Sequence, residues 1–290
     1  MFRNWSRYYF HVSWFIPLFF YSKDACAWGI FTHAYFAQLL LWGIPVADPK
    51  FRNAIRKFPE LLVAGAFLPD LSLFGRRAGT EGFDDTHHWE AAWSMLDMAD
   101  SEEERSIALG YCSHLFVDII AHNHFVPAHE TMWRDCGMYS HAFWEWAMDE
   151  HVSSHLFQHP DTLMRRHRKT LSGYAARVFG EREEVASRSL EYLENGVRAL
   201  RLARVNRICY LGALRLDPKI LIGFNYYLKE TAARMEQVNR ILQGEAPAWN
   251  AELHCKDLAR LTRERMGGFE RKVLQYRVPL PRNLFVPDPS

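Results

Sequence analysis

The sequence carries almost no net charge, no alternation typical of β-strands and no closely spaced pair of cysteines. Its 35 basic and 34 acidic residues leave a formal charge of +1, which argues against electrostatic capture of nucleic acid as the main activity. No internal repeat and no low-complexity segment occurs. The five cysteines form no C-x-x-C pair, so the sequence leaves open whether they make disulfides or stay as buried thiols.

Helical periods cover most of the chain instead. With 290 residues and 49% hydrophobic content, the chain fits one large domain or two small ones. The apolar spacing and the breaking residues predict an all-α, multi-helix bundle with polar residues 75–86 as a loop and a helix end at Pro127. The expected helices span residues 31–42, 49–67, 89–98, about 102–126, 139–157, 164–179, 182–212, 217–243 and 250–274.

Residues 1–27 read as a secretory signal peptide. Arg3 and Arg7 form a basic start, residues 8–21 are mostly apolar, and Ala27 ends a small-x-small cleavage pattern. Cleavage there predicts an exported protein, periplasmic or extracellular, whose first residue is Trp28. The alternative is an uncleaved membrane anchor.

The central segment that contains His114 and Asp118 is the most informative part of the chain. Side chains four residues apart on a helix share one face, so both can reach the same cation. Their neighbours are apolar, and a buried aspartate needs a partner. One interpretation is structural: a hydrogen-bonded His–Asp pair in a helical core. The other is a metal site, since imidazole and carboxylate are ligands that Zn²⁺ accepts.

Further ligand types occur around this segment, which favours a shared cluster of metals. Ten of the 14 histidines fall between His87 and His159, a compositional hint of metal binding. Each of these side chains alone would be an ordinary surface or capping residue, but together they lie on successive predicted helices. The candidates are His33, Asp70, His87 or His88, His124, His141 and Glu145.

In this order and context the chain resembles the zinc-dependent phospholipase C family, including the catalytic domain of the glycosylphosphatidylinositol-specific phospholipase D. It is more distantly similar to the single-strand-specific zinc nucleases. The motifs that carry the resemblance lie in residues 28–145: Trp28-Gly29-Ile30-Phe31-Thr32-His33, Leu68-Pro69-Asp70, His88-Trp89, His114-x₃-Asp118-x₅-His124 and His141-x₃-Glu145. The resemblance implies a helical fold with three zinc ions at the bottom of a cleft.

The resemblance also implies how these ligands are shared among the three zinc ions. Trp28, through its amine and carbonyl, and His33 would bind the first ion. Asp70, His88 and His114 would bind the second ion, and Asp118 would bridge the first two. The family places an aromatic residue directly after the ligand at 88, which favours His88 over His87. The third ion would take His124, His141 and Glu145.

The activity that the resemblance implies is phosphoester hydrolysis, and by itself it does not settle the substrate. We expect a phosphodiester hydrolase of phospholipase C type that uses a hydroxide bridging two metals. Asp70 is the expected general base. The predicted partners are a phospholipid or other phosphodiester and a membrane surface, with no stable nucleic-acid partner. The alternatives are a single-strand nuclease or 3′-nucleotidase of the same fold, and a non-catalytic metal-binding or membrane-anchored helical protein.

The chain is thus divided into a signal peptide (1–27), a catalytic core (28–160) and a helical extension (161–290). The extension matches no motif. The arginines at 198, 201, 204 and 207 share one side of a predicted helix, where they form either a solvated face or a contact for phosphate head groups. A di-iron bundle is disfavoured because the chain has no E-x-x-H pair.

Overall fold

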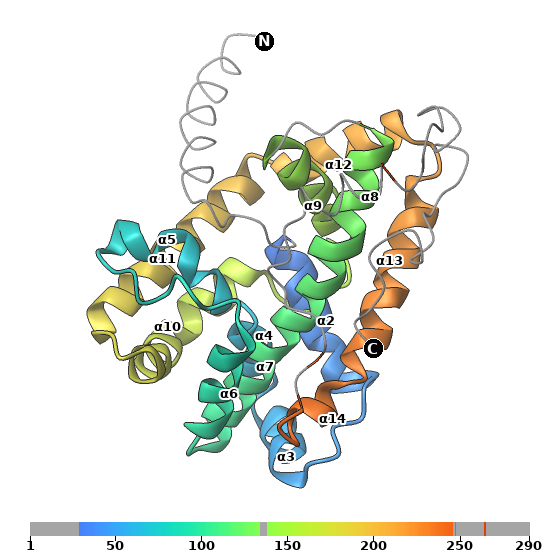
Figure 1. Cartoon of the computed structure of the whole chain (residues 1–290). Helices are drawn as coiled ribbons and strands as arrows, with labels where there is room; N and C mark the ends of the chain where they lie inside the picture. Colours follow the sequence, from blue (N-terminus) through green and yellow to red (C-terminus); the bar gives the residue numbers. More distant parts are fainter. Residues whose placement is uncertain (1–28, 134–137, 246, 248–263, 265–290) are drawn as a thin grey trace.

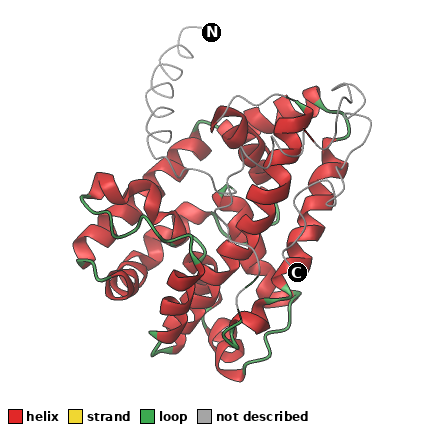
Figure 2. Ribbon diagram, viewed as in Figure 1, coloured by secondary structure: helices red, strands yellow, loops and turns green. Residues whose placement is uncertain are grey.

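In a computed structural model of the chain, residues 29–133, 138–245, 247 and 264 are described. These residues form helices joined by turns and contain no strand, which confirms the predicted all-α class (Figures 1 and 2). In order along the chain, the first half comprises α2 (Ile30–Trp42), α3 (Pro49–Lys57), α4 (Pro59–Gly65), η1 (Pro69–Leu71), α5 (Ser72–Ala78), α6 (Trp89–Asp97), α7 (Glu102–Ile120), the π-helix η2 (Ala121–Phe125) and α8 (Val126–Met132).

The second half of the described chain continues in the same way. It comprises α9 (Met138–Ser153), α10 (Pro160–Phe179), α11 (Glu183–Leu202), α12 (Val205–Leu216), α13 (Ile220–Met235) and α14 (Val238–Ile241). Within the described residues, no helix has both the length and the apolar content that crossing a bilayer requires. The predicted signal peptide and the predicted helix 250–274 lie outside the described residues, apart from residue 264.

Helix α7 is the central element of the fold, and it packs against α2, α3, α4, α6 and α13 (Figure 1). Its start is fixed by a capping box: Ser101 accepts a hydrogen bond from the Glu104 N–H, and the Glu104 carboxylate accepts one from the Ser101 N–H. From Ser106 to Ile120 every residue of α7 is buried. A helix that is apolar all round belongs in a core, so the polar His114 and Asp118 are carried into the interior.

Helices α4 and α7 cross at two glycines. A Cβ on Gly110 would lie 1.9 Å from the Leu62 carbonyl oxygen, and one on Gly65 would lie 2.2 Å from the Ile107 oxygen. Both contacts are far shorter than atoms tolerate, so only glycine allows the two backbones to approach this closely. The close approach holds the Ala66 carbonyl near α7, where it contacts the His114 ring.

Several predicted boundaries differ from the structure. The expected helix 49–67 divides at Phe58, because Pro59 cannot donate the N–H that a continuous helix needs. The loop expected at 75–86 is wrong at its start, since α5 reaches Ala78 and ends at Gly79 with φ +99°. Pro127 does not end a helix, because it occupies the first turn of α8.

The expected helix 182–212 is also interrupted, at Ala203 and Arg204, where α11 gives way to α12. Arg204 has a φ of +55°, in the left-handed region that few non-glycine residues adopt. The division of the chain at residue 160 stays a prediction; α9 ends at Ser153 and α10 begins at Pro160.

Candidate metal centre

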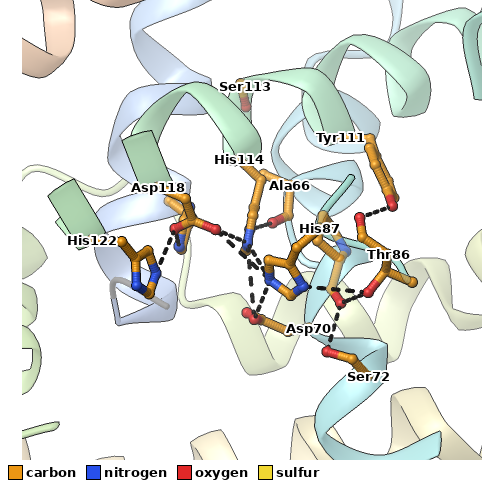
Figure 3. A network of polar contacts seen from close by, with 12 residues as sticks. Ala66, Asp70, Ser72, Thr86, His87, Tyr111, Ser113, His114, Asp118 and His122 are labelled. Atoms are coloured by element: carbon orange, nitrogen blue, oxygen red, sulfur yellow. Dashed lines mark hydrogen bonds and ion pairs between the residues drawn. The ribbon is translucent and has the colours of Figure 1, made fainter. Parts of the chain in front are cut away.

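Asp118 lies at the centre of the buried polar cluster, with its side chain fully inaccessible (Figure 3). Its Oδ1 atom is 3.3 Å from Nε2 of His33 and 3.7 Å from Nε2 of His122. Its Oδ2 atom is 3.0 Å from Nε2 of His114 and 3.7 Å from Nε2 of His87. One carboxylate is therefore surrounded by four imidazoles, and its two oxygens face different pairs.

The first group of potential ligands joins α2 and α7. His33, His114 and Asp118 each offer an atom within 4.8 Å of the others, and all three are buried. The rings of His33 and His114 are stacked, with centroids 3.6 Å apart and an angle of 7° between their planes. This arrangement aims both rings at the same carboxylate.

The second group comprises Asp70, His87 and His114. Asp70 comes from η1 and His87 from the turn before α6, and Nε2 of His87 lies 3.2 Å from Nε2 of His114. Nδ1 of His114 is 2.8 Å from the Ala66 carbonyl oxygen, which can only accept, so Nδ1 donates this hydrogen bond and Nε2 is the ring atom that faces the cluster. A backbone carbonyl that orients a histidine in this way is typical of metal ligands.

The third group comprises His122, His141 and Glu145. His141 and Glu145 are four residues apart on α9, and Nε2 of His141 lies 2.8 Å from Oε1 of Glu145. His122 belongs to η2, and its contact with Asp118 connects this group to the first one. The three groups thus form one continuous cluster rather than separate sites.

Burial sets the charge state of these side chains in the metal-free protein. Burial raises the pKa of Asp70 to about 7 and raises that of Glu145 well above its usual range. It lowers the pKa of His87 to about 3 and that of His141 to about 4. Asp118 differs: burial alone would raise its pKa, but the neighbouring His114 and His33 hold it well below its usual range.

The donor atoms of the cluster fit zinc. Imidazole nitrogens and carboxylate oxygens are zinc ligands, and several of them are buried without a well-formed hydrogen bond to any described residue. They are both ring nitrogens of His33, both oxygens of Asp118, Oδ1 of Asp70, Nε2 of His141 and Oε1 of Glu145. Each buried polar atom left this way costs about 1–3 kcal/mol, and cations would offset that cost.

The structure brings most of the sequence-predicted ligands together, with two differences. His33, Asp70, His114, Asp118, His141 and Glu145 all lie in the cluster. Trp28 lies outside the described residues. The sequence favours His88 over His87 as a ligand, yet the side chain of His88 is 37% exposed and lies 3.9 Å from Asp85. His87 lies in the cluster instead.

The second difference concerns His124, which is buried but belongs to none of the three groups found among the described residues. His122 is the histidine that joins His141 and Glu145 in the third group. The signal for His122 was present in the sequence, because it lies four residues after Asp118, the same spacing as His114 to Asp118. The rule that identified one pair would have identified the other.

One further buried group beside the cluster was missed from the sequence. Asp149 of α9 accepts hydrogen bonds from the backbone N–H and the hydroxyl of Thr32, both at 2.8 Å. Thr32 directly precedes His33 in the first turn of α2. Asp149 therefore fixes the start of the helix that carries a proposed ligand.

Comparison with known proteins gives a family for the chain. The family model described as zinc dependent phospholipase C matches residues 32–181, just over half of the sequence. No curated protein and no solved structure matches it. The matched residues include every described side chain of the three ligand groups, and the chain belongs to the zinc-dependent phospholipase C family.

Proposed function

We propose that this protein is a zinc-dependent phosphodiester hydrolase of phospholipase C type. The observation that carries the proposal is Asp118, a fully buried carboxylate with four imidazole nitrogens within 3.7 Å. So many potential ligands around one carboxylate exceed what a His–Asp hydrogen bond in a core requires. The family match and the donor set support the same conclusion.

The tautomer of His114 supports an assignment of ligands to three ions. Because Nδ1 of His114 is used by Ala66, only Nε2 can bind a metal, and it lies beside His87 and Oδ2 of Asp118. We assign His87, His114 and Asp70 to one zinc. His33 and the amine of Trp28 would hold a second, with Asp118 shared between the two.

His122, His141 and Glu145 would hold the third zinc. Bound zinc lowers the pKa of a coordinated water to about 7 and withdraws charge from a phosphoryl group. Asp70 lies at the edge of the cluster, with Oδ1 3.8 Å from Nε2 of His87 and 3.9 Å from Nε2 of His114. We assign it the role of accepting the proton of the attacking water in addition to binding metal.

Phospholipid is the proposed substrate class, as the family implies. A direct test compares the purified protein and its Asp118→Ala variant. The wild type should contain three zinc ions and hydrolyse phosphatidylcholine and a soluble choline phosphodiester. The variant should lose more than one ion and all activity, because Asp118 contacts histidines of all three ligand groups.

Two outcomes would overturn the proposal. Fewer than two zinc ions per wild-type chain would favour a non-catalytic protein, and cleavage of single-stranded DNA without cleavage of either choline ester would make the protein a nuclease. A loss of activity at full metal occupancy in Asp118→Ala would contradict the bridging role. Circular dichroism of the variant checks that its helices still form.

Export is proposed separately, from the composition of residues 1–27. Amino-terminal sequencing of protein recovered outside the cytoplasm should begin at Trp28. A chain that keeps its first residues would instead be membrane-anchored, and the amine ligand would be absent.

A further inference from the structure

Helix α12 and the adjoining ends of α11 and α13 expose several large aliphatic side chains. Ile208 is 58% exposed, Leu211 is 50% exposed and Leu216 is 49% exposed. Exposed aliphatic residues scattered singly are ordinary, but a contiguous set marks an interaction site. We call this set, with the basic residues among it, the α12 surface: Leu202, Arg204, Arg207, Ile208, Leu211, Arg215, Leu216, Lys219, Leu221 and Ile222.

The residues of α12 itself fall on one face of the helix. Positions 208, 211 and 215 are spaced by three or four residues, so their side chains point the same way. Arg204 directly precedes the helix. Ile208 and Leu211 stand in the middle, with Arg204 and Arg215 at the two ends. The inward side of α12 carries the buried residues Asn206, Cys209 and Ala213, and the helix packs on α9.

The charge around the α12 surface is strongly one-sided. Between Glu194 and Glu230 the sequence has seven basic residues and one acidic residue, Asp217. Asp217 is only 4% exposed, and it accepts a hydrogen bond from the Lys219 backbone. The whole chain has a net charge of only +1, so this part carries a local positive excess.

Two of these arginines have acidic partners. Arg207 lies 3.5 Å from Glu150 of α9, and Arg201 pairs with the buried Asp161 at 2.7 Å. Arg204 and Arg215 are exposed at the rim of the aliphatic residues. Aliphatic side chains with arginines at their edge are the pattern of a helix that lies in the interface of an anionic bilayer.

We propose that the α12 surface docks the protein on anionic phospholipid bilayers. The aliphatic side chains would enter the acyl boundary, and the arginines would remain at the level of the phosphates, where their long stems allow them to reach. Each basic residue near such a surface contributes about 1 kcal/mol of attraction. The surface would also bring the hydrolase to its substrate, a consequence that rests on the proposed function.

Other occupants fit this surface less well. In a two-fold dimer the same patch faces itself, so Arg204 and Arg215 would meet like charges with no exposed acidic partner on the surface. Residues 248–290 contain eight basic and five acidic residues, so they are not complementary in charge either. Single-stranded nucleic acid prefers aromatic side chains on which bases stack, and the centre of the surface is aliphatic.

Co-sedimentation of the full chain with vesicles tests the proposal. Vesicles containing a third phosphatidylglycerol in phosphatidylcholine should bind the wild type, and pure phosphatidylcholine should bind it at least tenfold more weakly. The double variant Ile208→Ser/Leu211→Ser should lose at least tenfold in binding to the anionic vesicles. The variant Arg204→Gln/Arg215→Gln should lose the preference for anionic lipid.

Trp42→Ser is the matched control, because Trp42 is 83% exposed at the end of α2 and lies outside the α12 surface. It should bind as the wild type does. Hydrolysis of the soluble choline phosphodiester should be unchanged in all these variants. Vesicle binding therefore tests the docking surface, and hydrolysis of the soluble substrate tests the proposed function.

Three results would overturn the proposal. Equal binding of the wild type and the serine double variant would show that another part of the chain carries the contact. No binding to anionic vesicles would exclude bilayers as the partner. A dimer of the wild type that the double variant abolishes, without any vesicle binding, would assign the surface to a second copy of the chain.

Discussion

Asp149 is a buried carboxylate that lies next to a proposed ligand without joining the cluster. It accepts hydrogen bonds from the N–H and the hydroxyl of Thr32 at the start of α2, and burial raises its pKa to about 7. Asp149→Asn keeps an oxygen acceptor, so it should change stability little. Asp149→Ala removes the acceptor of the buried Thr32 hydroxyl and one of the two acceptors of the Thr32 N–H, and should cost about 1–3 kcal/mol in urea unfolding.

The same two variants distinguish a role of Asp149 in positioning His33 from a role in stabilising the fold. Asp149→Ala should also weaken zinc binding, since His33 follows Thr32 directly, while Asp149→Asn should bind zinc as the wild type does. Equal zinc content in Asp149→Ala at reduced stability would show that Asp149 stabilises α2 without positioning His33.

His87 and His88 are neighbours in sequence with opposite surroundings. His87 is 7% exposed and lies in a ligand group, whereas the side chain of His88 is 37% exposed. His87→Asn should therefore lose about one zinc ion and reduce kcat by more than tenfold. His88→Asn should keep its zinc and most of its activity. Metal analysis and initial rates measure both effects. The reverse result would show that His88, the ligand expected from the sequence, binds the metal.

At the scale of the helices, the glycines between α4 and α7 set the position of His114. Gly110→Ala would place a methyl group 1.9 Å from the Leu62 oxygen, so the helices must move apart. We expect a loss of more than about 2 kcal/mol, in the range of overpacked cores, together with weaker zinc binding as the Ala66 carbonyl leaves His114.

Gly173→Ala is the matched control for this prediction. Gly173 lies inside α10, and the nearest atom to its Cβ would be 3.8 Å away in Glu183. An alanine there meets no clash and favours the helix, so the variant should be as stable as the wild type or up to about 1 kcal/mol more stable. Equal destabilisation by both variants in urea unfolding would contradict the close-contact argument.

The all-α class and the ends of several helices could be predicted because they depend on local chemistry. The capping box at Ser101 and the glycine stop at Gly43 are contained within a few residues. The π-helix η2 is different. It places His122 toward the cluster and follows α7 without a break, and nothing in the sequence of residues 121–125 distinguishes it from an α-helix.

The ligand types were predictable for a related reason, and the choice between neighbours was not. Buried histidines and aspartates in apolar runs are recognisable from composition, as with His114 and Asp118. Which of His87 and His88 turns inward depends on where α6 begins, and Trp89 is its first residue. The turn before α6 is held by tertiary contacts such as that of Thr86 with the Pro69 carbonyl oxygen at 2.5 Å.

At the scale of the whole molecule, the cluster joins segments that are distant in sequence. Its side chains come from α2, η1, the turn before α6, α7, η2 and α9, which span residues 33 to 145. Without cations, the interior of the fold holds Asp118 with four imidazoles and several polar atoms that lack well-formed hydrogen bonds. Zinc should therefore stabilise the folded chain, because the unfolded chain does not hold these ligands together.

Removal of zinc by a chelator should lower the free energy of unfolding. For each site, free zinc at a hundredfold excess over Kd contributes about 2.7 kcal/mol, so the Tm of the chelated protein should fall clearly below that of the zinc-loaded protein. Added zinc should restore it, and added magnesium should not, because Mg²⁺ prefers an octahedral shell of oxygen ligands. Asp118→Ala should respond to the chelator less than the wild type does, since it has fewer ions to lose. Identical calorimetric traces for wild type with and without chelator would show that the polar cluster is stable by itself and that metal does not contribute to the fold.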